Sequence, residues 1–116
     1  MFSKDMHVSL LLDFYGDILP ERRYEMTSLY YNDDLSLSEI ADICGISRQG
    51  VRDAVKKSEL ELRELEEKLG LAARFAAVRA QLDDISSNIE DISENVGESE
   101  SAQLRSIAES IKGMNI

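Results

Sequence analysis

The 116-residue sequence has little of several residue types that shape other classes of fold. It contains one proline, six glycines and no tryptophan, so few positions would interrupt a helix. Its single cysteine, Cys44, excludes an internal disulfide and a metal site built from several thiolates. We therefore expect an all-α fold, and we interpret Cys44 as a small buried side chain.

Long apolar runs and a signal peptide are also missing. No stretch approaches the roughly 20 apolar residues needed to span a bilayer, and the N-terminus lacks the basic start and small-residue cleavage site of a secretory signal. These absences predict a cytoplasmic protein without membrane insertion. The sequence also lacks a paired-carboxylate cleft, a glycine-rich phosphate loop and a nucleophile beside a base, so we expect no enzyme activity, no metal and no cofactor.

Positive charge is scarce, and its distribution is uneven. The chain carries 13 Lys and Arg against 23 Asp and Glu, a net charge of -10. Only residues 36–58 are not acidic in sum, and within 47–58 four basic side chains stand against Asp53 alone. Because polyphosphate repels an acidic surface, a nucleic acid would be bound by this one face and repelled by the rest of the chain.

Residues 35–57, LSLSEIADICGISRQGVRDAVKK, have the pattern of a helix-turn-helix. Ser36 and Glu39 have the spacing of a capping box, Gly45 suits the sharp turn, and Ser47 is placed to cap the second helix. The positions expected to be buried are small or apolar in every case. They are Ile40, Ala41, Cys44, Ile46, Val51 and Ala54.

The second of these helices has a basic outer surface, and in a DNA-binding unit its first turns would lie in the major groove. The predicted nucleic-acid-binding residues are Ser47, Arg48, Gln49, Arg52, Lys56 and Lys57. We expect Ser47 and Lys57 to contact phosphate, while Arg48, Gln49 and Arg52 face base edges. A compact packing module whose second helix happens to be basic is the alternative.

Other helices surround this motif in a predicted head domain, residues 1–69, of about four helices. One helix is expected over Met6–Tyr15, and another from Pro20 to Tyr31. The basic helix should continue to Leu69, where Gly70 ends it. Its apolar stripe continues through Val51, Val55, Ser58, Leu62, Leu65 and Leu69.

Residues 70–116 form a predicted helical arm with a heptad pattern. Gly97-Glu98-Ser99 predicts a break, followed by a short C-terminal helix. The heptad could pack within the chain, but its length favours the seam of a homodimer. The predicted seam is Leu71, Phe75, Val78, Leu82, Ile85, Ile89, Ile92 and Val96.

The segment Leu35–Val51, together with Glu66-Glu67-Lys68-Leu69-Gly70-Leu71, resembles the YlxM family of bacterial helix-turn-helix proteins, across roughly residues 5–75. Residues 19–51 are also similar to region 4 of sigma factors, which reads promoter DNA. The YlxM resemblance implies an all-helical regulatory protein linked to the signal recognition particle pathway, without known catalytic activity. Its partner would be DNA or RNA, bound through the basic helix, and possible further partners are components of that particle. A protein or ribonucleoprotein adaptor that does not read DNA sequence is the alternative.

Overall fold

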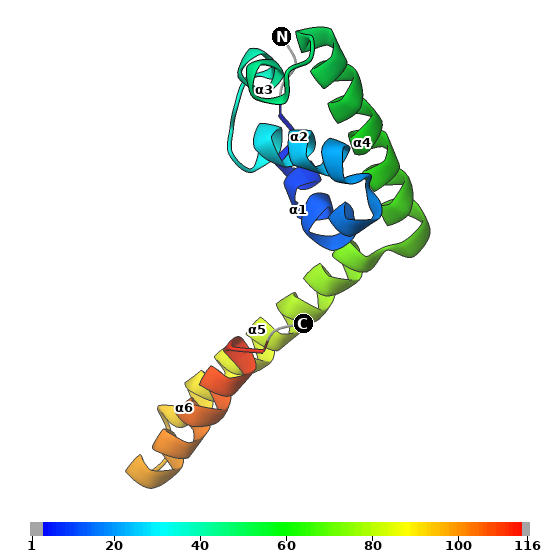
Figure 1. Cartoon of the computed structure of the whole chain (residues 1–116). Coiled ribbons are helices and arrows are strands. Elements are labelled where there is room, and N and C mark those ends of the chain that lie inside the picture. Colours follow the sequence, from blue (N-terminus) through cyan, green and yellow to red (C-terminus); the bar gives the residue numbers. More distant parts are fainter. Residues whose placement is uncertain (1–3, 115–116) are drawn as a thin grey trace. The chain divides into compact units, whose positions relative to one another are not determined.

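The computed structural model describes residues 4–114, in which every secondary-structure element is a helix (Figure 1). The predicted all-α fold is therefore confirmed. In chain order the elements are α1 (Met6–Tyr15), the short 3-10 helix η1 (Gly16–Ile18), α2 (Glu21–Tyr31), α3 (Leu37–Cys44), α4 (Arg48–Leu69), α5 (Leu71–Ser93) and α6 (Glu98–Lys112). They form two compact units, Met1–Ala72 and Ala73–Ile116.

The ends of the helices have local causes. Pro20 precedes the first residue of α2, where its missing N–H has no helical partner to lose. Gly70 ends α4 as predicted, with a φ of +64° and its N–H donated to the Glu66 carbonyl at 2.8 Å. The second break, predicted at residues 97–99, lies earlier in the chain, at residues 94–97 between α5 and α6. Gly97 is the N-cap of α6, so Glu98 and Ser99 belong to that helix, where Glu98 lies at its positive end.

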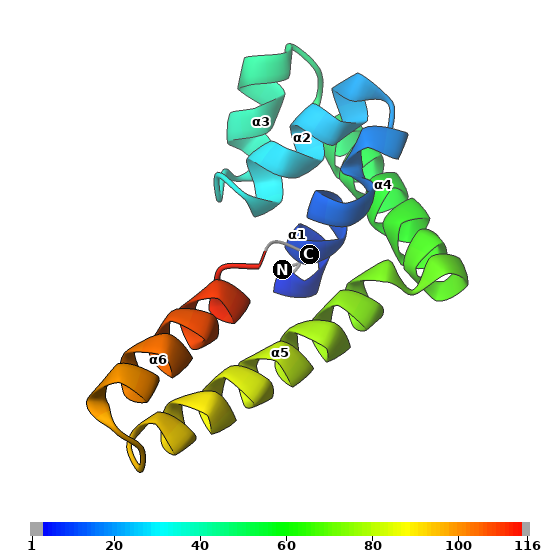
Figure 2. The same cartoon turned by 90° about the horizontal axis from the view of Figure 1, so that it is seen from below.

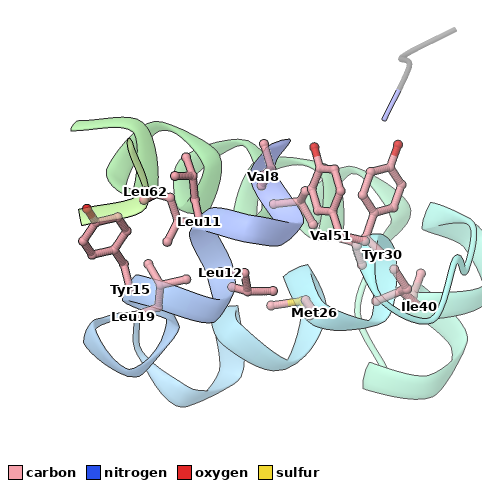
Figure 3. Close-up of a cluster of buried hydrophobic side chains, with 14 residues drawn as sticks. Val8, Leu11, Leu12, Tyr15, Leu19, Met26, Tyr30, Ile40, Val51 and Leu62 are labelled. Atoms are coloured by element: carbon pink, nitrogen blue, oxygen red, sulfur yellow. The ribbon is translucent and has the colours of Figure 1, made fainter. Parts of the chain in front are cut away.

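The core of the first unit is built along one side of α4. Val51, Val55 and Leu62 are fully buried there, at the predicted helical spacing. Helices α1, α2 and α3 all pack against α4 and supply the rest of the apolar cluster (Figure 3). The prediction that Leu69 continues the buried stripe is wrong, because α1 ends at Tyr15 and leaves Leu69 55% exposed.

Two polar contacts fasten α2 to α4 beside this core. Arg23 donates to both carboxylate oxygens of Glu61, at 3.0 and 2.9 Å, and to the hydroxyl of Ser58 at 3.4 Å. Ser58 is fully buried, so this contact satisfies a polar group inside an apolar stripe. Tyr31 donates its hydroxyl to Glu59. Burial, and then the hydrogen bond to Glu59, raise the pKa of Tyr31, so its hydroxyl remains a donor at neutral pH.

A third contact joins α1, α4 and the start of α5. The Tyr15 hydroxyl donates to Glu66 Oε1 at 2.6 Å and accepts the Leu71 N–H at 3.0 Å. The same Glu66 oxygen accepts the Ala72 N–H at 3.0 Å. The first amide groups of a helix have no partner within that helix. Here α1 and α4 supply the missing acceptors.

The second unit contains an antiparallel pair formed by α5 and α6, which lie side by side in both views (Figures 1 and 2). Ser86 is fully buried and donates to the Ala108 carbonyl at 3.1 Å. Arg79 donates to the Met114 carbonyl at 3.0 Å and to the Ile111 carbonyl at 3.4 Å. The Ile111 carbonyl also accepts the Met114 N–H at 3.2 Å, and the guanidinium complements the negative end of the helix.

The residues of the predicted dimer seam do not share one exposed face of α5. Phe75, Leu82 and Ile89 are half-buried, whereas the other four members on the helix are exposed. Val96 lies outside the helix, because α5 ends at Ser93, so the prediction of a helical heptad through residue 96 is wrong. The pairing of α5 with α6 accounts for the difference, since one flank of the apolar stripe turns toward α6. The exposed members are Leu71, Val78, Ile85 and Ile92.

The buried apolar stripe of α4 predicts that replacing two leucines of this helix by alanine, one buried and one exposed, will change the free energy of unfolding by different amounts. Leu62→Ala should lower the free energy of unfolding by about 2–5 kcal/mol, because it leaves a cavity in a fully buried site. Leu60→Ala, the matched control at a 60% exposed position, should change it by less than about 0.5 kcal/mol. Urea unfolding followed by circular dichroism measures both. Equal losses would contradict the described packing of α4.

The hydrogen bonds of the Tyr15 hydroxyl predict how much stability the first unit loses when this oxygen atom is removed. Tyr15→Phe keeps the buried ring but removes the donor to Glu66 and the acceptor for the Leu71 N–H. It should destabilise the first unit by about 1–3 kcal/mol, because buried polar groups lose their partner. Amide hydrogen exchange should accelerate at Leu71 in the variant. A variant with unchanged exchange there would show that the hydroxyl does not protect this amide.

Candidate nucleic-acid interface

The first helix of the motif, α3, starts at the predicted capping box. Ser36 Oγ accepts the Glu39 N–H at 3.1 Å, and Glu39 Oε1 accepts the Ser36 N–H at 3.0 Å. The hydrogen bonds from Ser36 hold the pKa of Glu39 below its ordinary value, because they favour the charged carboxylate. Both exchanged bonds predicted from the S-x-x-E spacing are therefore present.

The turn between α3 and α4 depends on Gly45. Its φ is +69°, in the left-handed region that glycine enters without steric cost. The Gly45 and Ile46 N–H groups both donate to the Ala41 carbonyl, at 2.9 and 3.2 Å. Arg22 of α2 donates to the Cys44 carbonyl at 3.0 Å, which caps the end of α3 from outside the motif. The turn therefore has a fixed geometry, and α4 starts in a defined direction.

Ser47 is the N-cap of α4, as predicted. Its Oγ accepts the Gly50 N–H at 3.0 Å. A hydroxyl that accepts through its oxygen can still donate its own proton. This residue is exposed, so its hydroxyl can both cap the helix and donate to an external acceptor such as a phosphate oxygen.

The predicted binding residues of α4 are all exposed. Arg48, Arg52 and Lys56 follow each other at intervals of four residues, so they form one row with steps of about 6 Å along the helix. Gln49 lies beside that row, and Lys57 lies on the other flank of the exposed side. Helical spacing therefore brings three cations together and separates the fourth from them. The opposite side of the same turns is the buried stripe of the core.

A contact within the helix involves one of the predicted base-reading residues. Gln49 Nε2 donates to Asp53 Oδ1 at 2.9 Å. Sequence reasoning missed this pair, although Gln and Asp at i and i+4 are neighbours on a helix surface. This bond uses one of the two amide N–H groups of Gln49, and Asp53 places a negative charge near the cations.

The acidic second half of α4 is largely engaged by the first unit itself. Glu59, Glu61 and Glu66 accept hydrogen bonds from Tyr31, Arg23 and Tyr15, respectively. Sequence reasoning missed these three pairs. Each bond joins residues at least 28 positions apart in the chain, which leaves no local signal in the sequence. Glu64 and Glu67 are the exposed carboxylates in the second half of α4, whereas the exposed charged side chains of the first half are mostly basic.

Residues 4–114 also bear on the predictions about Cys44, metal binding and membrane insertion. Cys44 is half-buried, where a fully buried side chain was expected, and no three His, Cys, Asp or Glu side chains in this range gather as metal ligands. None of the helices in the same part of the chain is long and apolar enough to cross a membrane.

Comparison with known proteins gives the family. The model of the UPF0122 family, described as "Putative helix-turn-helix protein, YlxM / p13 like", matches residues 2–107. The UPF0122 protein Teth514_1714 of Thermoanaerobacter sp. (strain X514) is 39% identical over 112 residues, which cover 96% of each chain. A UPF0122 protein of Acetivibrio thermocellus is 44% identical over 89 residues, covering 77% of this chain and 76% of that protein. The chain therefore belongs to the UPF0122 family of YlxM/p13-like helix-turn-helix proteins.

Proposed function

We propose that this protein binds nucleic acid through the exposed basic side of α4 and acts as a cytoplasmic regulatory protein, without catalysing a reaction. The observation that carries the proposal is the row of Arg48, Arg52 and Lys56 on a helix whose opposite side is fully buried. Because the core fixes the orientation of α4, its row of cations suits a recognition helix that lies in the major groove of DNA. The family description supplies the helix-turn-helix but no ligand.

The roles of the side chains follow from their positions in the first turns of α4. Ser47, at the positive end of the helix, would donate to a phosphate oxygen, and Lys56 and Lys57 would neutralise neighbouring phosphates. Arg48 and Arg52 would face base edges, where a guanidinium can form two hydrogen bonds with guanine. In this proposal Gln49 reads a base with the amide N–H and carbonyl oxygen that are not bonded to Asp53.

The proposal includes a homodimer and a link to the signal recognition particle pathway. The exposed heptad members on α5 support association of two chains, which would present two basic helices to the same nucleic acid. The link to the particle rests on the resemblance to the YlxM family.

A second candidate is an adaptor that docks on a ribonucleoprotein and does not read DNA sequence. The observation that favours it is the net charge of -10, which opposes general DNA binding. In this version the basic row meets RNA while acidic residues meet a basic protein. In the structure fewer of these carboxylates are available to a partner. Glu64 and Glu67 are exposed, whereas Glu59, Glu61 and Glu66 accept hydrogen bonds within the first unit.

The DNA version predicts a salt dependence and a difference between two variants. Two cationic phosphate contacts per subunit, from Lys56 and Lys57, give a slope of about −1.8 for log affinity against log salt, and about −3.6 for a homodimer. Arg52→Ala should cost about 1–3 kcal/mol and relax selectivity at one base position. Lys56→Ala should instead lower affinity evenly across sequences. Electrophoretic mobility shifts or fluorescence anisotropy with duplex DNA at several salt concentrations measure these effects.

Lys68→Ala is the matched control. Lys68 is an exposed lysine in the last turn of α4, about 18 Å along the helix from Lys56, so its removal should leave the affinity unchanged. If no duplex shifts at low salt, the DNA version is wrong.

The adaptor version predicts tighter binding to an assembled particle than to its parts. Titrations with the reconstituted signal recognition particle, its RNA and its protein subunit should rank the particle first. Affinity should fall steeply with salt, because opposite charges meet at both contacts. The Arg48→Glu/Arg52→Glu variant should lose binding to the particle and to the RNA alone. Equal binding by this variant, or none by the particle, would exclude the adaptor version.

A further inference from the structure

The α5–α6 pair buries small side chains and exposes large ones. Its inner residues include Ser86, Ser93 and Ala108, of which none is more than 3% exposed. The large aliphatic side chains outside this contact remain in water. They are Val78 at 36%, Ile85 at 49%, Ile92 at 54%, Ile107 at 50% and Met114 at 48% exposed. Small inner residues bury little apolar surface, and Leu82, Ile89 and Leu104 are only half-buried. The pairing of α5 with α6 therefore leaves part of the apolar surface of these helices exposed.

The exposed aliphatic residues fall on one side of the helix pair. Ile85 directly precedes the inner residue Ser86, and Ile107 directly precedes the inner residue Ala108. An antiparallel helix pair has an approximate two-fold axis perpendicular to the plane that contains both helix axes. Two residues, one on each helix, that lie at the same angle from the helix–helix contact therefore point to the same side of the pair. Val78 and Ile92 repeat the offset of Ile85 at intervals of seven residues, and Met114 lies just beyond the C-terminal end of α6. We call these five residues the aliphatic face.

Charged residues avoid this face. Asp83, Glu90, Arg105 and Lys112 each lie two positions before a member of the aliphatic face, and two positions turn a helix by about 200°. They therefore point to the opposite side of the pair. Within residues 73–114, helical spacing places only Arg74 and Glu100 among the charged residues on the aliphatic face, near its two ends. An uncharged, aliphatic surface of this length is typical of a protein–protein contact.

We infer that the aliphatic face binds the same face of a second copy, antiparallel to the first, to form a four-helix bundle. The inference rests on the homodimer proposed above and specifies its surface and direction. An antiparallel arrangement centred on Ile85 brings Ile85 against Ile85 of the partner and Val78 against Ile92 of the partner. It also brings Arg74 to the same end as Glu100 of the partner. A parallel arrangement would instead bring Ile92 opposite Glu100 of the partner and gather like charges at each end.

This surface differs from the eight-residue seam expected from the heptad alone. It contains Ile107 of α6 and Met114 just beyond that helix. It omits five members of the seam, among them Leu82 and Ile89, whose half-buried side chains lie on the flank toward α6. Substitutions at Ile89 would therefore disturb the hairpin as well as the dimer. Ile85 is the sharper position for a test, because it is exposed in the single chain.

The first experiment measures the mass of the full chain in solution by light scattering at about 10 μM. The unmodified chain should be a dimer, and Ile85→Asp should raise the dissociation constant at least about tenfold, because a charge would be buried without a partner. Ser87→Asp is the matched control, since Ser87 is exposed and two positions away on the opposite side of α5. It should remain a dimer. Circular dichroism should show unchanged helix content in both variants.

The second experiment tests the direction by disulfide formation in a Cys44→Ala chain, with oxidised glutathione as the oxidant. Ile85→Cys should cross-link to itself, because the antiparallel arrangement brings the two Ile85 positions together. Ser87→Cys, on the opposite side, should not cross-link. A mixture of Val78→Cys and Ile92→Cys chains should form the mixed dimer in preference to either symmetric one.

The possible results of these two experiments contradict different parts of the proposed dimer. A monomer for the unmodified chain overturns the homodimer and this inference together, but leaves nucleic-acid binding by α4 in place. A dimer that survives Ile85→Asp overturns the aliphatic face as its contact. A dimer in which Ile85→Cys cross-links only with Ile107→Cys overturns the antiparallel direction. Nucleic-acid binding is measured separately, and the monomeric Ile85→Asp variant should reduce a slope of about −3.6 to about −1.8.

Discussion

The burial of one side of α4 is the constraint on which the rest of the first unit depends. Val51, Val55 and Leu62 are fully buried against helices that come before α4 in the chain. The same turns carry the basic residues on their other side. A helix that contributes to the core cannot rotate about its axis without exposing apolar surface. The directions of Arg48, Arg52 and Lys56 are therefore determined by the core and not by a ligand.

The charges along α4 follow from the same constraint. Its second half is acidic, and three of those carboxylates accept hydrogen bonds from Tyr15, Arg23 and Tyr31. Hydrogen bonds to charged groups contribute more than neutral ones, so the first unit uses its carboxylates to fasten α1 and α2. The excess of negative charge in the chain is thus partly structural. The first half of α4 is left with the outward-directed charge on which nucleic-acid binding would depend.

Most helices and the turn of the motif could be predicted from the sequence because their causes are local. The Ser36–Glu39 capping box, the positive φ of Gly45 and the end of α4 at Gly70 each depend on residues within a few positions. The placement of the six candidate binding residues on exposed positions also follows from helical spacing. Their roles remain predictions.

Other features could not be predicted because their causes are not local. The heptad on α5 does not reveal which of its flanks turns toward α6, since a helix in a hairpin and a helix in a dimer have the same apolar period. Arg79 interrupts the apolar pattern, and only the folded pair shows that it caps the carbonyls of α6. The exposure of Leu69 depends on where α1 ends.

The hydrogen bonds around Tyr15 affect the order in which the protein can form during synthesis. The Leu71 amide donates to Tyr15 and the Ala72 amide donates to Glu66, so the first turn of α5 gains the Tyr15 acceptor only when α1 already lies on α4. Both helices leave the ribosome before α5 does, and domains generally fold as units in that direction. The folded first unit thus provides a ready end from which α5 can grow, and the costly nucleation of a new helix is reduced.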